Sequence, residues 1–295
     1  MSLTADQLTR RSDGAACAER AAGNPATVLG ASWLIATACA LAVASGCSQA
    51  NSAASSPPQP TDLPDHSEPV ALNPAEFSAD IDNKYWPMKP GTRWIYKETT
   101  ETGEQVRVVV TATSVTKEIA NGITARVVRD TVTEDGKLVE DTVDWYAQDS
   151  EGNIWYLGEK TAEFEQGKLA SREGSFEAGV DGAMAGVIMP SDPADGMKYR
   201  QEYYQGKAED NGEVLSTDEM AAVPAGYYGN ALLTQDTNTI EPHILEYKLY
   251  APNVGPVLVL GVSGGATREQ LVETRDVSAE AARSAGTTRL GDPYE

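Results

Sequence analysis

One short motif in this sequence matches the surroundings of a catalytic nucleophile. Residues 261–265 read G-V-S-G-G and place Ser263 at the centre of a G-x-S-x-G pattern. In hydrolases that use this pattern, the serine lies on a turn from a strand into a helix, and the catalytic histidine follows it in the chain. Here a strand-like run follows the glycines, and the last histidine, His243, precedes the serine. The motif therefore predicts a hairpin turn, and we assign no catalytic residue to it.

The two histidines offer little other chemistry. His66 lies in a proline-rich stretch, and His243 begins an alternating run after Glu241 and Pro242. We expect both imidazoles to be solvated rather than to bind a metal ion. The three cysteines are Cys17, Cys39 and Cys47, so no thiolate ligand is available after residue 47. The sequence thus predicts neither a metal site nor a cofactor.

Acidic residues are abundant, but their spacing selects no site. Residues 149–153 (D-S-E-G-N) have the composition of a calcium-binding loop. An EF-hand loop has its glycine at the sixth position, whereas here glycine is fourth and strand-like runs lie on both sides. We therefore predict a hairpin turn. Among 44 Asp and Glu residues no single carboxyl pair stands out, so an extracytoplasmic hydrolase that uses acidic residues is an alternative function without assigned residues.

The net charge of −21 excludes one class of partner. A strongly acidic surface repels polyphosphate, so we predict no binding to nucleic acid. The same charge favours the solubility of the folded domain.

Cys47 carries the prediction of where the protein is held. The nineteen residues from Val28 to Gly46 contain no charged side chain, and Ala44, Ser45 and Gly46 precede the cysteine. This arrangement resembles a lipobox, the site at which a signal peptidase cuts and a bacterial cysteine is lipidated. The resemblance implies a cleaved signal segment at 1–47 and a protein attached to the cell membrane by lipid, facing the periplasm or the outside. A retained membrane helix and an ordinary secretory signal are the alternatives.

A tether is expected after the lipidated cysteine. Residues 48–82 contain prolines at positions 57, 58, 60, 64, 69 and 74, with Ser, Ala and Asn between them. Prolines at this density block both helix and sheet. We therefore predict a disordered tether over 48–82 that separates the membrane from the domain.

Residues 83–276 have the pattern of an antiparallel β domain. Asn121-Gly122 and Asp135-Gly136 are two-residue hairpin turns between β-rich runs. The run 138–149 alternates, with Val139, Val143 and Trp145 opposite Glu140, Thr142 and Asp144. We predict an all-β fold, a single antiparallel meander that forms a curved sheet or half-closed barrel. Residues 277–295 are expected to form a short helix or a frayed tail.

Aromatic residues are the candidates for a ligand surface. Adjacent pairs on one strand point to opposite faces, so one member of each pair is expected in the core and the other is free to contact a ligand. The candidate ligand-facing aromatics are Trp94, Trp145, Tyr146, Trp155 and Tyr156.

Three segments resemble a pattern found in uncharacterised exported bacterial β proteins. They are KPGTRWIY at 89–96, VPAGYYGNALLTQ at 223–235 and YAPNVGPVLVL at 250–260. The resemblance covers most of residues 85–274 and implies a strand after a Pro-Gly turn near the start and a Y-A-P-x-V-G turn near the end. It implies no reaction. We therefore predict a membrane-tethered, non-enzymatic binding or scaffold lipoprotein, with an apolar small ligand or a protein as its partner.

Overall fold

The computed structural model describes residues 63–100 and 103–294. The predicted signal segment, Cys47 and the first part of the predicted tether lie outside these residues. Among the described residues, no helix has the length and apolar character needed to cross a membrane.

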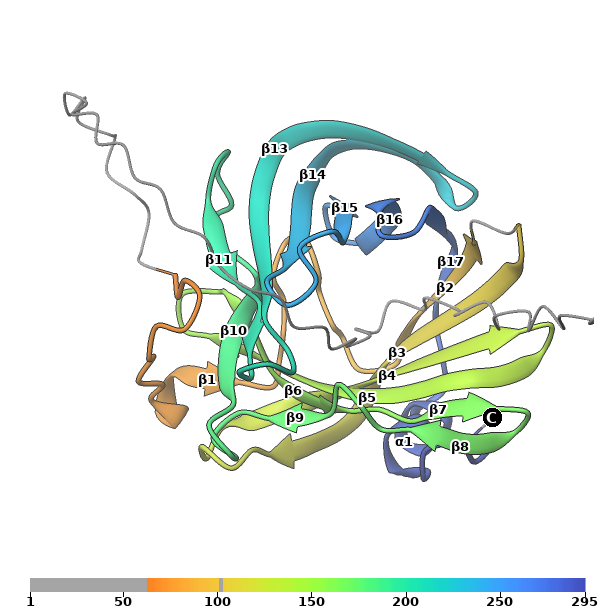
Figure 1. Cartoon of the computed structure of the whole chain (residues 1–295), viewed down its shortest axis with the longest axis horizontal. Helices are drawn as coiled ribbons and strands as arrows, with labels where there is room; N and C mark the ends of the chain where they lie inside the picture. The colour runs from red at the N-terminus through yellow and green to blue at the C-terminus, as the bar shows by residue number, and fades with distance from the viewer. Residues whose placement is uncertain (1–62, 101–102, 295) are drawn as a thin grey trace, which may run out of the picture.

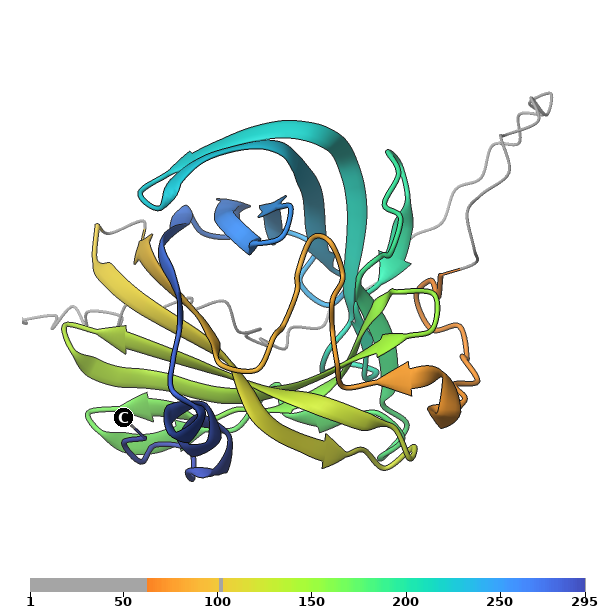
Figure 2. The same cartoon turned by 180° about the vertical axis from the view of Figure 1, so that it is seen from behind.

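Two antiparallel meanders make up most of the fold (Figures 1 and 2). The first contains β2 (Thr92–Thr99), β3 (Gln105–Glu118), β4 (Thr124–Glu134), β5 (Lys137–Asp149) and β6 (Ile154–Lys160). The second contains β13 (Asp210–Val223), β14 (Gly226–Asn238), β15 (Leu245–Ala251), β16 (Gly255–Ser263) and β17 (Thr267–Asp276).

The two meanders are joined into one nearly closed sheet. On one side β17 pairs with β2. On the other side β10 (Met184–Met189) pairs with β6, while β11 (Lys198–Arg200) and β12 (Glu202–Tyr203) lead from β10 to β13. The prediction of an all-β, antiparallel, barrel-like fold is confirmed. The shorter elements are η1 (Pro74–Glu76), β1 (Phe77–Ser78), β7 (Glu163–Glu165), β8 (Lys168–Ser171), β9 (Phe176–Glu177) and α1 (Ala279–Thr287).

The turns that mimic catalytic or calcium-binding motifs are hairpins. Ser263 is the last residue of β16, and the chain returns as β17 from Thr267, so the G-x-S-x-G motif is a strand-to-strand turn. Between β5 and β6, Asp149 Oδ1 accepts hydrogen bonds from the backbone N–H groups of Glu151 (3.0 Å) and Asn153 (2.9 Å). This carboxylate is therefore used to hold the turn.

The polar face of β5 points into the sheet's interior. Glu140, Thr142 and Asp144 are buried, whereas Val139 and Val143 on the opposite face are only half-buried. Thr142 and Asp144 lie opposite Asp130 and Val128 of β4. The interior is thus lined by carboxyl groups as well as by apolar side chains.

Helix α1 covers the outer side of β3 and β4 (Figure 2). It lies within residues 277–295, for which the sequence predicts a short helix or a frayed tail. Ser278 caps its N-terminus by accepting from Ala281 N–H at 3.1 Å. The side chain of Arg129 on β4 reaches its other end and donates to the carbonyls of Ala285 (3.0 Å) and Thr288 (2.7 Å).

Residues 63–82 pack against the sheet, although the sequence places them in the tether. Phe77 and Ser78 pair with Asp149 and Gln148 of β5, and Ile81 is buried in the core. The prolines prevent this segment from forming a long strand, but they leave its apolar side chains and carbonyl groups able to contact the domain. The ordered domain therefore begins before residue 83.

Candidate ligand site

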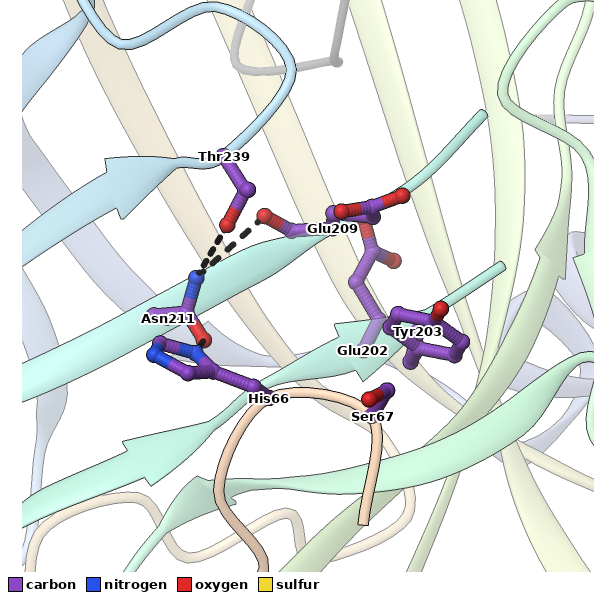
Figure 3. Close-up of a pocket in the computed structure, with 7 residues that line it drawn as sticks. All are labelled: His66, Ser67, Glu202, Tyr203, Glu209, Asn211 and Thr239. Atoms are coloured by element: carbon purple, nitrogen blue, oxygen red, sulfur yellow. Dashed lines mark hydrogen bonds between the residues drawn. The ribbon is translucent and has the colours of Figure 1, made fainter. Parts of the chain in front are cut away.

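A small hollow lies where the segment before β1 crosses the ends of β12 and β13 (Figure 3). Its volume is about 240 Å³. The side chains around it come from the crossing segment, from β12 and β13, and from the turns next to them. The lining residues are His66, Ser67, Glu202, Tyr203, Glu209, Asn211 and Thr239.

Arg200 of β11 holds the crossing segment in place. One guanidinium nitrogen donates to the carbonyls of His66 and Glu68, both at 2.7 Å. The other terminal nitrogen donates to Ala185 O on β10 at 2.8 Å, and the backbone N–H of Arg200 donates to Pro64 O at 2.7 Å. One buried arginine therefore fixes the crossing segment, which forms one rim of the hollow, to the sheet.

Asn211 of β13 forms the opposite wall. Its Nδ2 donates to Thr239 Oγ1 at 3.1 Å and to Glu209 O at 3.3 Å. Its Oδ1 lies 3.3 Å from His66 Nδ1, which closes the ring of contacts seen in Figure 3. His66, expected to be a solvated residue of the tether, is thus exposed but positioned at the rim of the hollow.

On the interior face of β12 and β13, opposite Tyr203 and Asn211, lies a pair of buried carboxyl groups. Glu202 is 2% exposed and Asp210 is 0% exposed. Asp210 Oδ1 accepts from Asn238 Nδ2 at 2.6 Å. Both Glu202 oxygens and Asp210 Oδ2 have no donor among the described groups. The negative charge of Asp210 acts on Glu202, so the two carboxyl groups are neighbours in the interior.

Burial is the main influence on the protonation of both carboxyl groups. Burial raises the pKa of Glu202 well above its ordinary value, and the neighbouring charge of Asp210 raises it further. Burial also raises the pKa of Asp210, to about 7. Both carboxyl groups therefore favour the neutral form more strongly than an exposed carboxyl group does.

Further carboxyl groups continue from this pair through the interior. Glu98 and Glu269 lie directly opposite each other on β2 and β17, and Asp144 and Glu159 do so on β5 and β6. Burial is the main cause that raises the pKa of Glu98 and of Asp144 to about 7. We call the following seven residues the buried acidic set: Glu98, Asp144, Glu159, Glu202, Asp210, Asp236 and Glu269.

Lys248 supplies positive charge to this set. Its Nζ lies 2.8 Å from Asp236 and 3.6 Å from Glu246, so two carboxylates already share its charge. Tyr156 contributes a hydroxyl that lies 2.8 Å from Asp144 and 2.9 Å from Glu159. Among the described residues, no three His, Cys, Asp or Glu side chains are grouped in a way that would hold a metal ion.

The five aromatic residues predicted to face a ligand are all buried. Tyr146 and Tyr156 stack with ring centroids 5.0 Å apart. Trp145 lies under the ammonium group of Lys117. The indole N–H of Trp155 donates to Asp149 Oδ2 at 2.7 Å, and that of Trp94 donates to Val254 O at 2.6 Å. None of the five lines the hollow. The structure thus brings Tyr146 and Tyr156 together, and a ligand-facing role for these aromatics stays a prediction.

Sequence reasoning missed the residues of the hollow and the buried acidic set. The burial of Glu98 on β2 could have been predicted from the sequence. Glu98 follows Trp94 and Tyr96 at a spacing of two residues, so all three lie on the same face of the strand. On β6 this spacing is broken, because a bulge with Gly158 at φ +126° separates Tyr156 from Glu159. The bulge places these two residues, three positions apart, against the same partner, Asp144.

Comparisons with known proteins add little to this site. No family model matches the chain, and no curated protein matches its sequence. A crystal structure of a "putative lipoprotein" from Parabacteroides distasonis ATCC 8503 is 13% identical in sequence, with a TM-score of 0.38. The match covers 65% of this chain and 99% of that one. A likeness this weak carries no argument about the function of this chain.

Proposed function

We propose that this chain is an exported, lipid-anchored protein whose β domain binds a small ligand in the hollow beside β12. The observation that carries the binding function is the hollow itself, where polar side chains from separate segments of the chain converge. A concave site with convergent polar groups is where a small ligand is expected to bind. Cys47, at the end of an uncharged run, supports the anchored location.

A hydrolase is the second candidate, because Glu202 and Asp210 are neighbouring buried carboxyl groups with raised pKa, as carboxyl pairs in acid–base catalysis can be. Glycosidases, however, hold their two carboxyl groups roughly 5–9.5 Å apart to flank the scissile bond. Here both groups are buried in the interior, with Glu202 2% and Asp210 0% exposed, so they do not flank an open site. Binding is therefore the better supported function.

The binding function is tested by blocking the hollow. Ser67 lies exposed on the rim, so Ser67→Trp places a large ring over the opening. We expect thermal unfolding of the wild-type chain to shift upward with at least one compound in a panel of small cationic, neutral and anionic molecules. The shift should be lost in Ser67→Trp.

The matched control is Val70→Trp, which adds the same ring to the same segment at a residue outside the hollow. It should respond like the wild type. A panel in which no compound stabilises the wild-type chain would refute the binding function, as would an unchanged response in Ser67→Trp.

Anchoring is tested by Cys47→Ala. A lipidated cysteine carries two or more acyl chains, which are enough for stable membrane attachment. We expect Cys47→Ala to move the protein from the membrane fraction to the soluble fraction, while Cys39→Ala, which changes a cysteine inside the apolar run, leaves it on the membrane. Membrane retention of Cys47→Ala would instead indicate that residues 28–46 persist as a membrane helix.

A further inference from the structure

We propose that the ligand of the hollow is a neutral sugar ring, which binds through its hydroxyl groups. This inference rests on the proposed binding function and names its ligand class. It is carried by the polar groups that line the hollow without a partner, because they combine several hydrogen-bond donors with a carboxylate acceptor around a space of one small ring.

Three hydroxyl groups at the hollow are available as donors. They belong to Ser67, Tyr203 and Thr239, which come from three separate segments of the chain (Figure 3). The hydroxyls of Ser67 and Tyr203 have no hydrogen-bond partner among the described residues. Thr239 Oγ1 accepts from Asn211 Nδ2 at 3.1 Å, and its own proton has no acceptor in the part of the chain that the structure describes. A hydroxyl can both donate and accept, so each of the three can pair with a hydroxyl of a ligand.

Glu209 supplies an acceptor and limits the charge of the ligand. Its Oε1 accepts from Gly206 N–H at 2.8 Å, whereas Oε2 has no donor among the described groups. This carboxylate repels an anion, and none of the described lining residues is Lys or Arg. A half-buried carboxylate by itself attracts a cation only weakly, while a neutral hydroxyl makes a charge-assisted hydrogen bond to it. The hollow therefore favours a neutral ligand that carries hydroxyl groups.

The fold holds these groups in position before a ligand binds. Ser67 lies in the crossing segment, which Arg200 binds through two carbonyls at 2.7 Å. Asn211 donates to Thr239 Oγ1 and to the carbonyl of Glu209, so it is a positioning residue for both. Groups that are already held in place lower the cost of ordering the site when a ligand binds.

Tyr203 adds an apolar surface to the hollow. Its half-buried ring is part of the lining, and the C–H groups of a sugar ring can pack on the face of an aromatic ring. Sites for drug-sized ligands measure about 300–1,000 Å³, and this hollow measures about 240 Å³. It therefore takes one sugar ring, and the further rings of a longer saccharide would lie in solvent.

The experiment compares D-glucose, D-galactose and D-mannose with cyclohexanol, cyclohexylamine and cyclohexanecarboxylate. The last three have a six-membered ring with one polar group, which is neutral, cationic or anionic. Binding to the full chain is measured by ligand-observed NMR in a polyoxyethylene detergent, which contains no sugar. We expect at least one of the three sugars to bind and none of the three comparison compounds to bind.

Two conservative variants test the hydroxyl groups. Ser67→Ala and Tyr203→Phe each remove one free hydroxyl and keep the rest of the side chain. Each should weaken the sugar by about twofold to tenfold, the value of one neutral hydrogen bond. Ser67→Trp, which closes the opening, should abolish its binding.

The matched controls are Ser150→Ala and Tyr227→Phe. They remove the same two kinds of hydroxyl from exposed residues outside the hollow. Both should bind the sugar as tightly as the wild type does. Thermal unfolding of each variant without ligand reports whether it folds.

The outcomes separate this inference from the function on which it rests. If no sugar binds, but a comparison compound or a member of the wider panel does and Ser67→Trp abolishes that binding, the hollow is a ligand site and the sugar assignment is wrong. If cyclohexanol binds as tightly as the sugar, or if Ser67→Ala and Tyr203→Phe leave the sugar's affinity unchanged, its hydroxyl groups are not what the hollow recognises. If none of these compounds and none of the wider panel binds, both proposals fail.

Discussion

Arg129→Met is expected to lower the free energy of unfolding by about 3–5 kcal/mol, the usual cost of breaking a buried ion pair by removing one partner. Arg129 is 0% exposed and Asp141 is 1% exposed. Arg129 Nε donates to Asp141 Oδ1 at 2.8 Å, and a terminal nitrogen donates to Oδ2. Methionine fills much of the volume but leaves the Asp141 carboxylate buried without its cation.

The same substitution should loosen helix α1. The last carbonyls of a helix have no partner within it, and Arg129 satisfies those of Ala285 and Thr288. Asp141 also accepts from Gly291 N–H at 2.7 Å, which holds the chain after the helix. We therefore expect limited proteolysis to cut Arg129→Met after residue 276 at a rate well above that of the wild type.

Chemical unfolding with two further variants checks this assignment. Arg275→Met removes an exposed arginine 3.7 Å from Glu273 and should cost less than about 1 kcal/mol. Arg129→Met combined with Asp141→Leu removes both charges and should recover much of the lost stability. Equal stabilities of Arg129→Met and Arg275→Met would show that the buried pair does not hold the helix.

The strand order was accessible from the sequence because its turns are local. Asp135 and Gly136 both have positive φ, as the type I′ hairpin between β4 and β5 requires. The contacts that close the sheet are not local. β6 pairs with β10 across a stretch of short strands, and no residue type in either segment specifies the other.

The hollow lay beyond sequence reasoning for the same reason. Arg200 lies more than 130 positions from the carbonyls of His66 and Glu68 that it binds. A proline-rich segment predicts an absence of regular structure, but it does not predict whether an arginine elsewhere will hold its backbone. The acidic face of β5 was visible in the alternation of residues 138–149. That alternation alone does not tell which face is inside, and here both faces are covered in part.

The fold itself should lose stability as the pH rises from about 5 to 8, because its interior holds carboxyl groups that prefer to be neutral. Burial is the main cause that raises the pKa of Glu269 to about 8 and that of Glu98 to about 7. Between its ordinary pKa and its folded pKa, each group binds more protons in the folded state than in the unfolded state. Its stabilising contribution is therefore complete at acidic pH and lost as the pH rises through the folded pKa.

Glu269→Gln should remove much of this loss. Glu269 and Glu98 lie opposite each other on β17 and β2, each with one carboxyl oxygen that has no donor among the described groups. One pKa unit corresponds to about 1.4 kcal/mol, so a neutral amide should stabilise the chain by roughly 2–4 kcal/mol at pH 8 and by little at pH 5. The midpoint of thermal unfolding at pH 8 should rise by about 5–10 °C.

The pH dependence distinguishes this effect from a general change in surface charge. Glu273→Gln alters an exposed residue of the same strand and should shift the unfolding midpoint by less than about 2 °C at either pH. Glu98→Gln should reproduce the stabilisation by Glu269→Gln, and the double variant should gain less than the sum, because each single change already relieves the repulsion between the two carboxyl groups. A gain for Glu269→Gln that is equal at pH 5 and pH 8 would mean that Glu269 is already ionised in the folded protein at pH 5, and the interior would then have to hold that charge by a contact other than protonation.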